Sequence, residues 1–229
     1  SVLAGLIFTR KSLGAMAATM VLGGAVLLIA MLSYLDPEIT PLVPVLKSYW
    51  LTIHVSLIAG SYGFLMLGAI IGFINLLMYV VLSANNKSTI VKIIKEMTYI
   101  SEMTLTGGIV LLSIGTYLGG VWANESWGRY WGWDAKETWA LVSILVYAFI
   151  LHMRLIPGLK SIFAYNFATL FGLSSVIMTY FGVNYYLSGL HSYAAGDPVP
   201  IPMWVYYAVA AAAIVSFIAY MQKNKHEIS

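Results

Sequence analysis

Six long apolar runs alternate with short polar segments along this chain. They lie at about 12–34, 51–82, 98–121, 137–156, 162–185 and 203–221. Because roughly 20 helical residues cross a hydrocarbon core of about 30 Å, each run is long enough to span a membrane. Backbone polar groups in lipid must be satisfied within their own segment, and no strand-like alternation is visible, so each run is expected to be a helix. The sequence therefore predicts an all-α integral membrane protein with about six transmembrane helices in one domain, 1–229.

The composition supports this class and excludes several chemistries. The chain is 60% hydrophobic and 9% charged, with a mean hydropathy of +0.85, which is unlike a soluble domain. The lipid bilayer is the first expected partner, and the net charge of +3 gives no reason to expect nucleic acid. The absence of cysteine excludes disulfides, thiolate metal sites and a cysteine nucleophile within this chain. Ser1 begins the chain without a signal-peptide pattern, which fits an excerpt from a longer polypeptide with further helices upstream.

Lysine and arginine are divided unevenly between the two ends of the predicted helices. With alternating crossings, one side receives nine of them, namely Arg10, Lys11, Lys87, Lys92, Lys95, Arg154, Lys160, Lys223 and Lys225. The other side receives Lys47, Arg129 and Lys136. The positive-inside rule makes the first side cytoplasmic. We expect a multi-pass protein of a bacterial inner (plasma) membrane, since nothing in the sequence indicates a plastid.

The segment 122–139, WANESWGRYWGWDAKETW, is expected to be a tryptophan-rich loop on the external side. It holds five tryptophans, interleaved with Gly128 and Gly132. Aromatic rings are common at the membrane–water boundary, where they form an anchoring belt. Five within eighteen residues are more than a belt needs, and glycines allow close approach of the backbone. This pattern favours a surface that holds a large planar ligand.

Two histidines are predicted to lie on the same side as this loop. His54 stands in the first turns of the long run 51–82, which is longer than the bilayer core and can project beyond it. His191 stands in a glycine-flanked turn between the last two runs. Each, taken alone, is better explained as a solvated polar residue. As a pair beside an aromatic surface, they suggest the axial ligands of a haem iron.

The remaining histidines differ from that pair. His152 falls within the run 137–156, where an ionisable side chain is costly and suggests function. Its alternative is snorkelling towards the inner interface, because Arg154 is close by. His226, in the terminal KNKHEIS, is expected to be solvated and without a role.

Charged residues of the tryptophan-rich segment divide into structural and binding candidates. Asp134 and Glu137 have the spacing of a capping box at a helix start. Arg129 and Lys136 are candidates for contact with an anionic ligand, since a haem carries two propionates and arginine pairs with carboxylates through two hydrogen bonds. The alternative for Arg129 is a surface salt bridge with Glu125.

Pairs of small residues predict close helix packing. Gly68 and Gly72 form a small-xxx-small pattern, and Gly119 stands beside Gly120.

Three stretches together resemble a known family. WGRYWGWDAKETWAL, followed by LHMRL and YFGVNYYLSGLHSYA, is similar to the CcsA (ResC) family of cytochrome c biogenesis proteins. That family belongs to the haem-handling proteins whose tryptophan-rich segment is called the WWD domain. The resemblance covers about 49–193. It implies that this chain holds haem b at an external site as part of the system II cytochrome c synthase.

The resemblance also implies partners and a reaction. The family works with CcsB (ResB), sometimes fused to it, and attaches the haem vinyl groups to the two thiols of a CxxCH motif in apocytochrome c. Thiol-reducing factors keep those thiols available. The expected enzyme is therefore a cytochrome c haem lyase, or synthase, that acts as a complex.

The resemblance assigns the family's site residues to matching positions in this sequence. His54 and His191 match the two external ligands of haem iron, and His152 matches a transmembrane haem site. The haem-holding surface corresponds to Trp122, Trp127, Trp131, Trp133 and Asp134. The family's second transmembrane histidine belongs to CcsB and has no counterpart here.

Three other functions remain open. A CcmC-like system I protein shares six helices, the WWD segment and two external histidines, but delivers haem without forming a bond. A non-haem membrane transporter would use His152 as a relay, although few other ionisable groups lie in the apolar runs. A structural subunit would use the tryptophans only as anchors. The haem content of the purified protein separates these functions.

Overall fold

The computed structural model describes residues 12–31, 48–191 and 200–226, and every element within them is helical. The elements are α2 (Leu13–Met31), α3 (Tyr49–Val80), α4 (Lys87–Trp127), α5 (Ala135–His152), η2 (Met153–Leu155), α6 (Ile162–Ile177), η3 (Met178–Gly182), α7 (Val183–Tyr186) and α8 (Met203–Lys225). Each predicted run coincides with a helix or a continuous helical stretch. Residues 32–34 of the first run lie outside the described residues. The predicted all-α class is confirmed.

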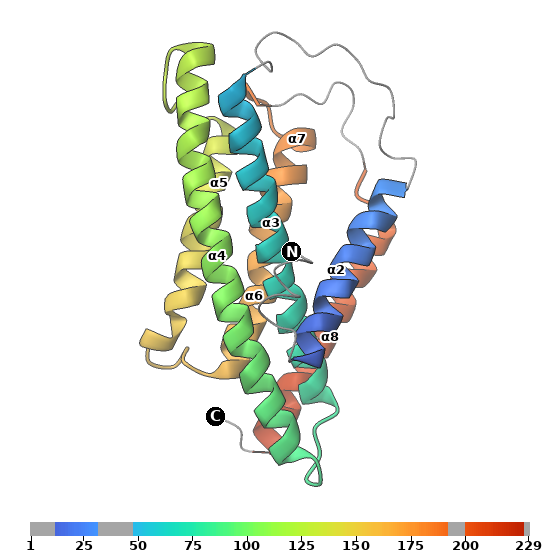
Figure 1. Ribbon diagram of the computed structural model, residues 1–229. Helices are drawn as coiled ribbons and strands as arrows, with labels where there is room; N and C mark the ends of the chain where they lie inside the picture. The colour runs from blue at the N-terminus through green and yellow to red at the C-terminus, as the bar shows by residue number, and fades with distance from the viewer. Residues whose placement is uncertain (1–11, 32–47, 192–199, 227–229) are drawn as a thin grey trace.

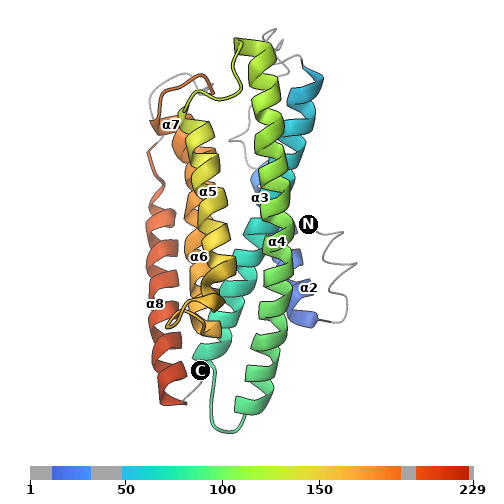
Figure 2. The same ribbon diagram turned by 90° about the vertical axis from the view of Figure 1, so that its left-hand side faces the viewer.

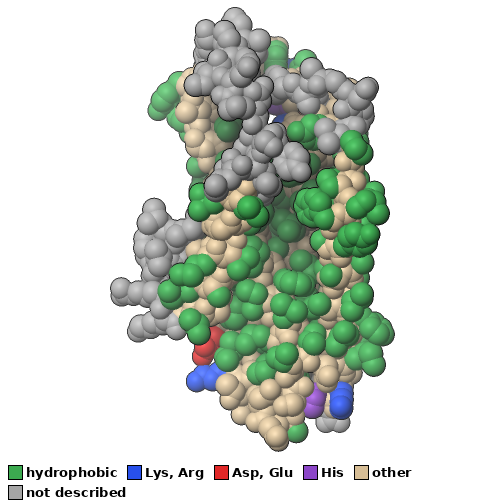
Figure 3. Space-filling model, turned by 90° about the vertical axis from the view of Figure 1, so that its right-hand side faces the viewer, with side chains coloured by type: hydrophobic (Ala, Val, Ile, Leu, Met, Phe, Trp, Pro, Cys, Tyr) green, Lys and Arg blue, Asp and Glu red, His purple; other side chains and the backbone are tan. Residues whose placement is uncertain are grey.

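Among the described residues, five helical stretches are long and apolar enough to cross a membrane. They are Tyr49–Val80, Lys87–Trp127, Ala135–Leu155, Ile162–Tyr186 and Met203–Lys225, and α2 adds a shorter apolar helix. Hydrophobic side chains are spread along the face that carries α2 and α8, with charged side chains towards its lower end (Figure 3), and α8 exposes large apolar residues such as Phe217. Such a surface suits lipid rather than water. The chain is a multi-pass membrane protein.

The helix α4 extends beyond the apolar run that predicted it. It begins at Lys87 rather than 98 and ends at Trp127 rather than 121. Hydropathy misses the first turns because they carry lysines, but no proline interrupts the segment and the helix simply continues. With 41 residues it is about 60 Å long, roughly twice the thickness of a hydrocarbon core. Its ends therefore lie beyond the apolar layer.

The helices α3, α4, α5 and α6 form a bundle that runs along one axis (Figures 1 and 2), with α3 also contacting α2 and α8. Glycines on α3 set its close contacts. A Cβ at Gly68 would collide with Leu105 of α4, and one at Gly72 would lie 2.8 Å from the carbonyl oxygen of Asn166 on α6. The predicted close packing at these two glycines is confirmed.

A buried polar cluster joins three helices, close to the end of α3 and the start of α6. Asn75 of α3 donates to Asn166 Oδ1 of α6 over 2.7 Å, and Asn166 donates to Thr98 Oγ1 of α4 over 2.9 Å. Both asparagines are fully buried. Hydrogen bonds of this kind hold helices together in lipid, where no hydrophobic force acts between them.

The bundle has two chemically different ends. At one end, Lys87 donates to the carbonyl of His226 over 2.7 Å, and Arg154 pairs with Glu102 at 3.3 Å. The described residues of the larger basic set belong to this end by the direction of their helices, whereas Arg129 and Lys136 belong to the other. Arg10, Lys11 and Lys47 lie outside the described residues. The start of α3, the end of α4, the start of α5 and α7 meet at the second end (Figure 1).

Candidate functional site

The sequence suggested that the tryptophan-rich segment is one loop, but the structure shows that it is not. Trp122 and Trp127 belong to the last turns of α4, and α5 begins at Ala135, so only residues 128–134 connect two helices. The helix ends at Gly128, whose φ of 71° lies in the left-handed region that glycine adopts readily. Trp122 is thereby placed on a rigid helix and is almost fully buried. The predicted loop was too long because Gly128 is the first strong stop signal in the segment.

The connection folds around the predicted capping box. The backbone N–H of Lys136 donates to Asp134 Oδ1 over 2.9 Å, and the N–H of Asp134 donates to Glu137 Oε2 over 3.2 Å. The same Glu137 oxygen accepts the N–H of Gly132 over 2.8 Å. These bonds satisfy free N–H groups at the start of α5, and the predicted box is confirmed.

His54 is held by the end of α4. Its Nδ1 lies 2.7 Å from the carbonyl oxygen of Gly115, and its ring stacks on Trp122 at 6.4 Å with an interplanar angle of 11°. A Cβ at Gly119 would lie 2.6 Å from the imidazole Cε1, so glycine is required there for the ring to fit. The sequence predicted close packing at Gly119, and the structure shows that the packed group is the imidazole.

His191 reaches the same place from the turn after α7. Its Nδ1 lies 2.9 Å from Asp134 Oδ1, and the other carboxylate oxygen accepts the N–H of Leu190 over 2.7 Å. The ring meets Trp122 at 5.6 Å and Trp127 at 4.9 Å, edge to face in both cases. Trp122 therefore contacts both histidines and fixes the planes of their rings.

The electrostatics of the pair favour a neutral imidazole beside a carboxylate. Burial lowers the pKa of His191, although the nearby Asp134 acts to raise it. Burial acts to raise the pKa of Asp134, but the N–H groups of Lys136 and Leu190 and the contact with His191 outweigh it, so the net shift is downward. The side chains are 13% and 3% exposed. At neutral pH, His191 therefore donates its Nδ1–H to an ionised Asp134.

Both histidines thus have Nδ1 engaged by an acceptor. This leaves Nε2 as the nitrogen that can bind a metal, the arrangement that metal-ligating histidines commonly show. The described residues contain no group of three or more His, Cys, Asp or Glu side chains placed to hold a bare metal ion. Two imidazoles suit a metal that already has four ligands, as iron in a porphyrin has.

A cavity of about 80 Å³ adjoins the two histidines. Its lining includes polar residues that the sequence did not single out, namely Tyr62, Thr116 and Thr179. Thr179 stands in the π-helical segment η3, and such segments recur at functional sites, but a sequence gives little signal for them. Pockets for drug-sized ligands hold roughly 300–1,000 Å³. The donor set fits a haem chemically, but the surrounding segments must separate to admit one.

The other predicted residues of the segment divide between the cavity and the surface. Trp131 lines the cavity and meets Trp133 edge to face at 5.7 Å, whereas Trp133 is 70% exposed. Trp133 also has a φ of 57°, a strained value for a residue with a large side chain. Arg129 pairs with Glu137 at 3.4 Å, not with Glu125. The guanidinium also lies 5.9 Å from the Trp127 ring centroid.

His152 lies apart from the other two predicted ligands. It is the last residue of α5, which spans 18 residues or about 27 Å. Its ring is exposed, and Nδ1 lies 2.7 Å from the carbonyl oxygen of Ala148. The structure brings together His54 and His191 but not His152.

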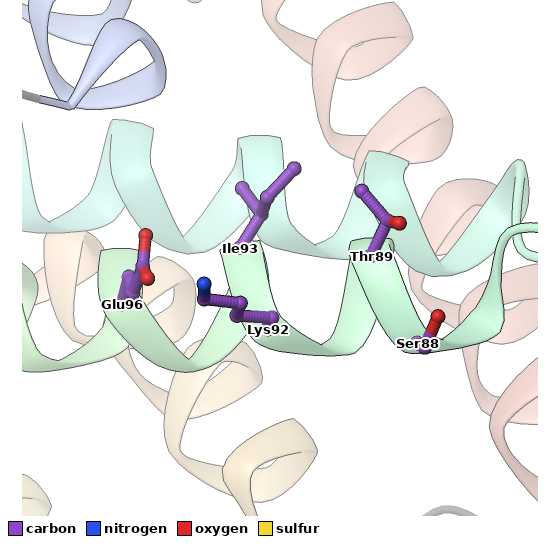
Figure 4. Close-up of a pocket in the computed structure, with 5 residues that line it drawn as sticks. All are labelled: Ser88, Thr89, Lys92, Ile93 and Glu96. Carbon is purple, nitrogen blue, oxygen red and sulfur yellow. The ribbon is translucent and has the colours of Figure 1, made fainter.

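A second hollow, of about 460 Å³, lies near the start of α4. Its five lining residues, Ser88, Thr89, Lys92, Ile93 and Glu96, all come from that one helix (Figure 4). Within the part of the chain that the structure describes, no other element contributes a group to it, so it is an open helix surface rather than a site.

Comparisons with known proteins agree with the resemblance. The family model described as Cytochrome C assembly protein matches residues 1–191. The chain is similar to protein NrfI of Wolinella succinogenes, with 51% identity over 222 residues that cover 97% of this chain and 24% of NrfI. It is similar to the cytochrome c biogenesis protein CcsA of Cyanophora paradoxa, with 35% identity over 212 residues, 73% of this chain and 66% of that protein. The CcsA protein of Prochlorococcus marinus is 37% identical over 199 residues, 74% of this chain and 63% of its own length.

Proposed function

The chain belongs to the cytochrome c assembly protein family, and we propose that it is the haem-binding membrane subunit of a system II cytochrome c synthase. In this role it presents haem b at an external site, where His54 and His191 ligate the iron. The observation that carries the proposal is the convergence of the two histidines on Trp122, each with Nδ1 already engaged. Neutral imidazoles with Nε2 available are the form that iron requires.

The residues of this chain bind and orient rather than react. Trp131 lines the cavity and offers aromatic surface to a planar ligand, Trp122 and Trp127 pack against the imidazoles, and Asp134 holds His191 in one tautomer. A bound haem supplies two vinyl groups, and each thioether forms by addition of a cysteine S–H across one vinyl double bond, with no leaving group. The chain has no cysteine, so both thiols come from the CxxCH motif of apocytochrome c. Catalysis then rests on positioning.

Partners are needed for the complete activity. The chain spans about a quarter of NrfI and just under two thirds of the CcsA relatives. We infer a CcsB (ResB)-like membrane partner for the synthase activity, and thiol-reducing factors that prepare the substrate. His152, exposed at the basic end of the bundle, is the candidate for receiving haem on the cytoplasmic side. The WWD segment then lies on the external face of a bacterial inner membrane.

The test is haem ligation in the purified protein. The unmutated chain in detergent is expected to give the absorption spectrum of a six-coordinate, low-spin haem in both oxidation states. His54→Ala and His191→Ala should each weaken or abolish that spectrum, whereas His226→Ala, at the far end, should leave it unchanged. Absence of haem from the unmutated chain, even when it is produced with a CcsB-like partner, overturns the proposal.

A second assay separates synthesis from delivery. The chain, a CcsB-like partner and an apocytochrome with CxxCH are produced together, and covalent haem is measured after denaturation. Thioether formation that depends on His54 and His191 supports the synthase. Haem binding without thioether formation supports a CcmC-like delivery function.

A further inference from the structure

The charged groups beside the two histidines can be accounted for one by one. Glu137 accepts the N–H groups of Gly132 and Asp134 and pairs with Arg129 at 3.4 Å. Asp134 accepts two backbone N–H groups and the Nδ1–H of His191. Both carboxylates, and the guanidinium of Arg129, are therefore engaged within the protein. Lys136 differs from these groups, because its ammonium forms no ion pair with a described residue.

Lys136 lines the same cavity as His54 and His191. Its Nζ donates to Asn184 Oδ1 over 2.6 Å, which is a short bond to a neutral amide. The ion pairs formed by the described residues do not include Lys136. An ammonium that is partly removed from water and whose hydrogen bond goes to a neutral amide rather than to a carboxylate is costly, and an anionic ligand in the cavity would lower that cost.

Asn184 stands beside the Lys136 ammonium, next to the residues that line the cavity. Because an ammonium can only donate, the amide oxygen of Asn184 must face Lys136, which leaves its NH₂ group with two N–H donors. Within the described residues, no acceptor for that NH₂ group is found. An ammonium and an amide N–H side by side can bind the two oxygens of one carboxylate. Asn184 follows the π-helical segment η3, which had no sequence signal, so the pair could not be anticipated.

We propose that Lys136 and Asn184 form a binding subsite for a carboxylate of the tetrapyrrole, and that Arg129 does not. The inference rests on the proposed function, because it assigns part of the same site. A propionate held here would bring the porphyrin edge that carries the carboxylates towards Lys136 of α5 and Asn184 of α7. The vinyl groups of protoporphyrin IX lie towards the opposite edge, so the subsite also determines where the reactive carbons face.

The experiment compares two forms of one pigment, ferric protoporphyrin IX and its dimethyl ester, which lacks the negative charges. Dissociation constants for both are measured by absorption titration of the purified chain in detergent. Lys136→Met is expected to weaken binding of the diacid by on the order of tenfold or more, the effect of a lost charge-assisted hydrogen bond, and to leave the ester nearly unchanged. Because detergent affects both pigments in every variant, the ratio of the two constants isolates the carboxylate contact.

Matched variants show whether a change in the diacid-to-ester ratio is specific to Lys136. Lys92→Met removes an exposed lysine at the other end of α4 and should preserve the diacid-to-ester ratio. Asn184→Asp provides a competing carboxylate for Lys136 and should lower diacid affinity more than ester affinity. The inference is overturned if Lys136→Met leaves the diacid-to-ester ratio unchanged. It is also overturned if Arg129→Gln, rather than Lys136→Met, abolishes the preference for the diacid.

Failure of the inference can be told from failure of the proposed function. If the unmutated chain binds neither pigment, the haem function itself fails. If Lys136→Met binds neither because it does not fold, Asn184→Asp decides: a lost preference for the diacid supports the subsite, and an unchanged preference overturns it.

Discussion

The Nδ1 atom of His191 lies 2.9 Å from Oδ1 of Asp134, although 57 positions separate the two residues. The same carboxylate begins α5 as its N-cap and accepts the N–H of Leu190. Asp134 therefore joins the start of one helix to the turn that carries a candidate iron ligand. Gly189 permits this contact, because a Cβ there would collide with the carboxylate.

Asp134→Asn separates these two roles. Asparagine is as good an N-cap as aspartate, so α5 should remain intact. It loses the negative charge that stabilises the His191 tautomer, and we expect haem affinity to fall about 10–100-fold, as when the hydrogen-bond partner of a metal ligand is removed. Haem titration measures the change. Ser161→Ala, which removes the cap of α6, is the control and should leave haem affinity unaltered. Equal affinities for Asp134→Asn and the unmutated chain would falsify the assigned role.

Gly119→Ala tests whether the packing of Gly119 against the imidazole holds His54 in position. A Cβ at this position falls 2.6 Å from the imidazole, so the ring must shift out of its stack on Trp122. The low-spin haem spectrum should be lost or shifted, with a stability cost of about 1–3 kcal/mol from overpacking. Gly107→Ala, on the same helix, brings its Cβ no closer than 3.6 Å to Phe64 and should be tolerated. Identical spectra for both variants would show that His54 is not held as described.

Trp133 offers a test of backbone strain. Its φ of 57° costs roughly 1–2 kcal/mol for a residue with a Cβ, whereas glycine adopts it freely. Trp133→Gly and Trp133→Ala both remove an exposed ring, but only glycine relieves the strain. The glycine variant should therefore be more stable than the alanine variant by about 1 kcal/mol, read as a higher Tm in detergent. An alanine variant that matches or exceeds the glycine variant contradicts this expectation.

The buried state of His191 predicts a pH dependence of stability. Burial lowers its pKa in the folded protein below the ordinary 6.5 that it has when unfolded. As pH falls through about 6.5, the unfolded chain takes up a proton that the folded chain refuses, so stability decreases towards acid. The stabilising contribution of neutral His191 to the folded protein is fully present above pH 6.5. Tm measured from pH 8 to pH 5 should fall more steeply for the unmutated chain than for His191→Gln. Parallel curves would show that His191 does not contribute.

Local signals predicted the helices and the capping box well. Apolar runs placed the bundle helices, and the spacing of Asp134 and Glu137 predicted the start of α5. The side-chain partners that complete the site were not predictable. The contact of His54 with Gly115 joins two antiparallel helices, and that of Lys136 with Asn184 depends on how α7 packs. Such pairs are set by helix rotation and by the π-helical segment, which periodicity does not encode.

The continuity of α4 makes the site sensitive to chain length. Each residue of a helix advances its neighbours by about 100°, so one residue inserted between Gly115 and Trp122 would turn the indole away from His54. Substitutions along this stretch can be absorbed locally, but insertions and deletions cannot. Among the described connections, the turns at 81–86 and 156–161 lie at the opposite end of the bundle, so we expect changes in length to be tolerated there. Those two turns are therefore where a tag or an extra domain can be inserted without disturbing the histidines.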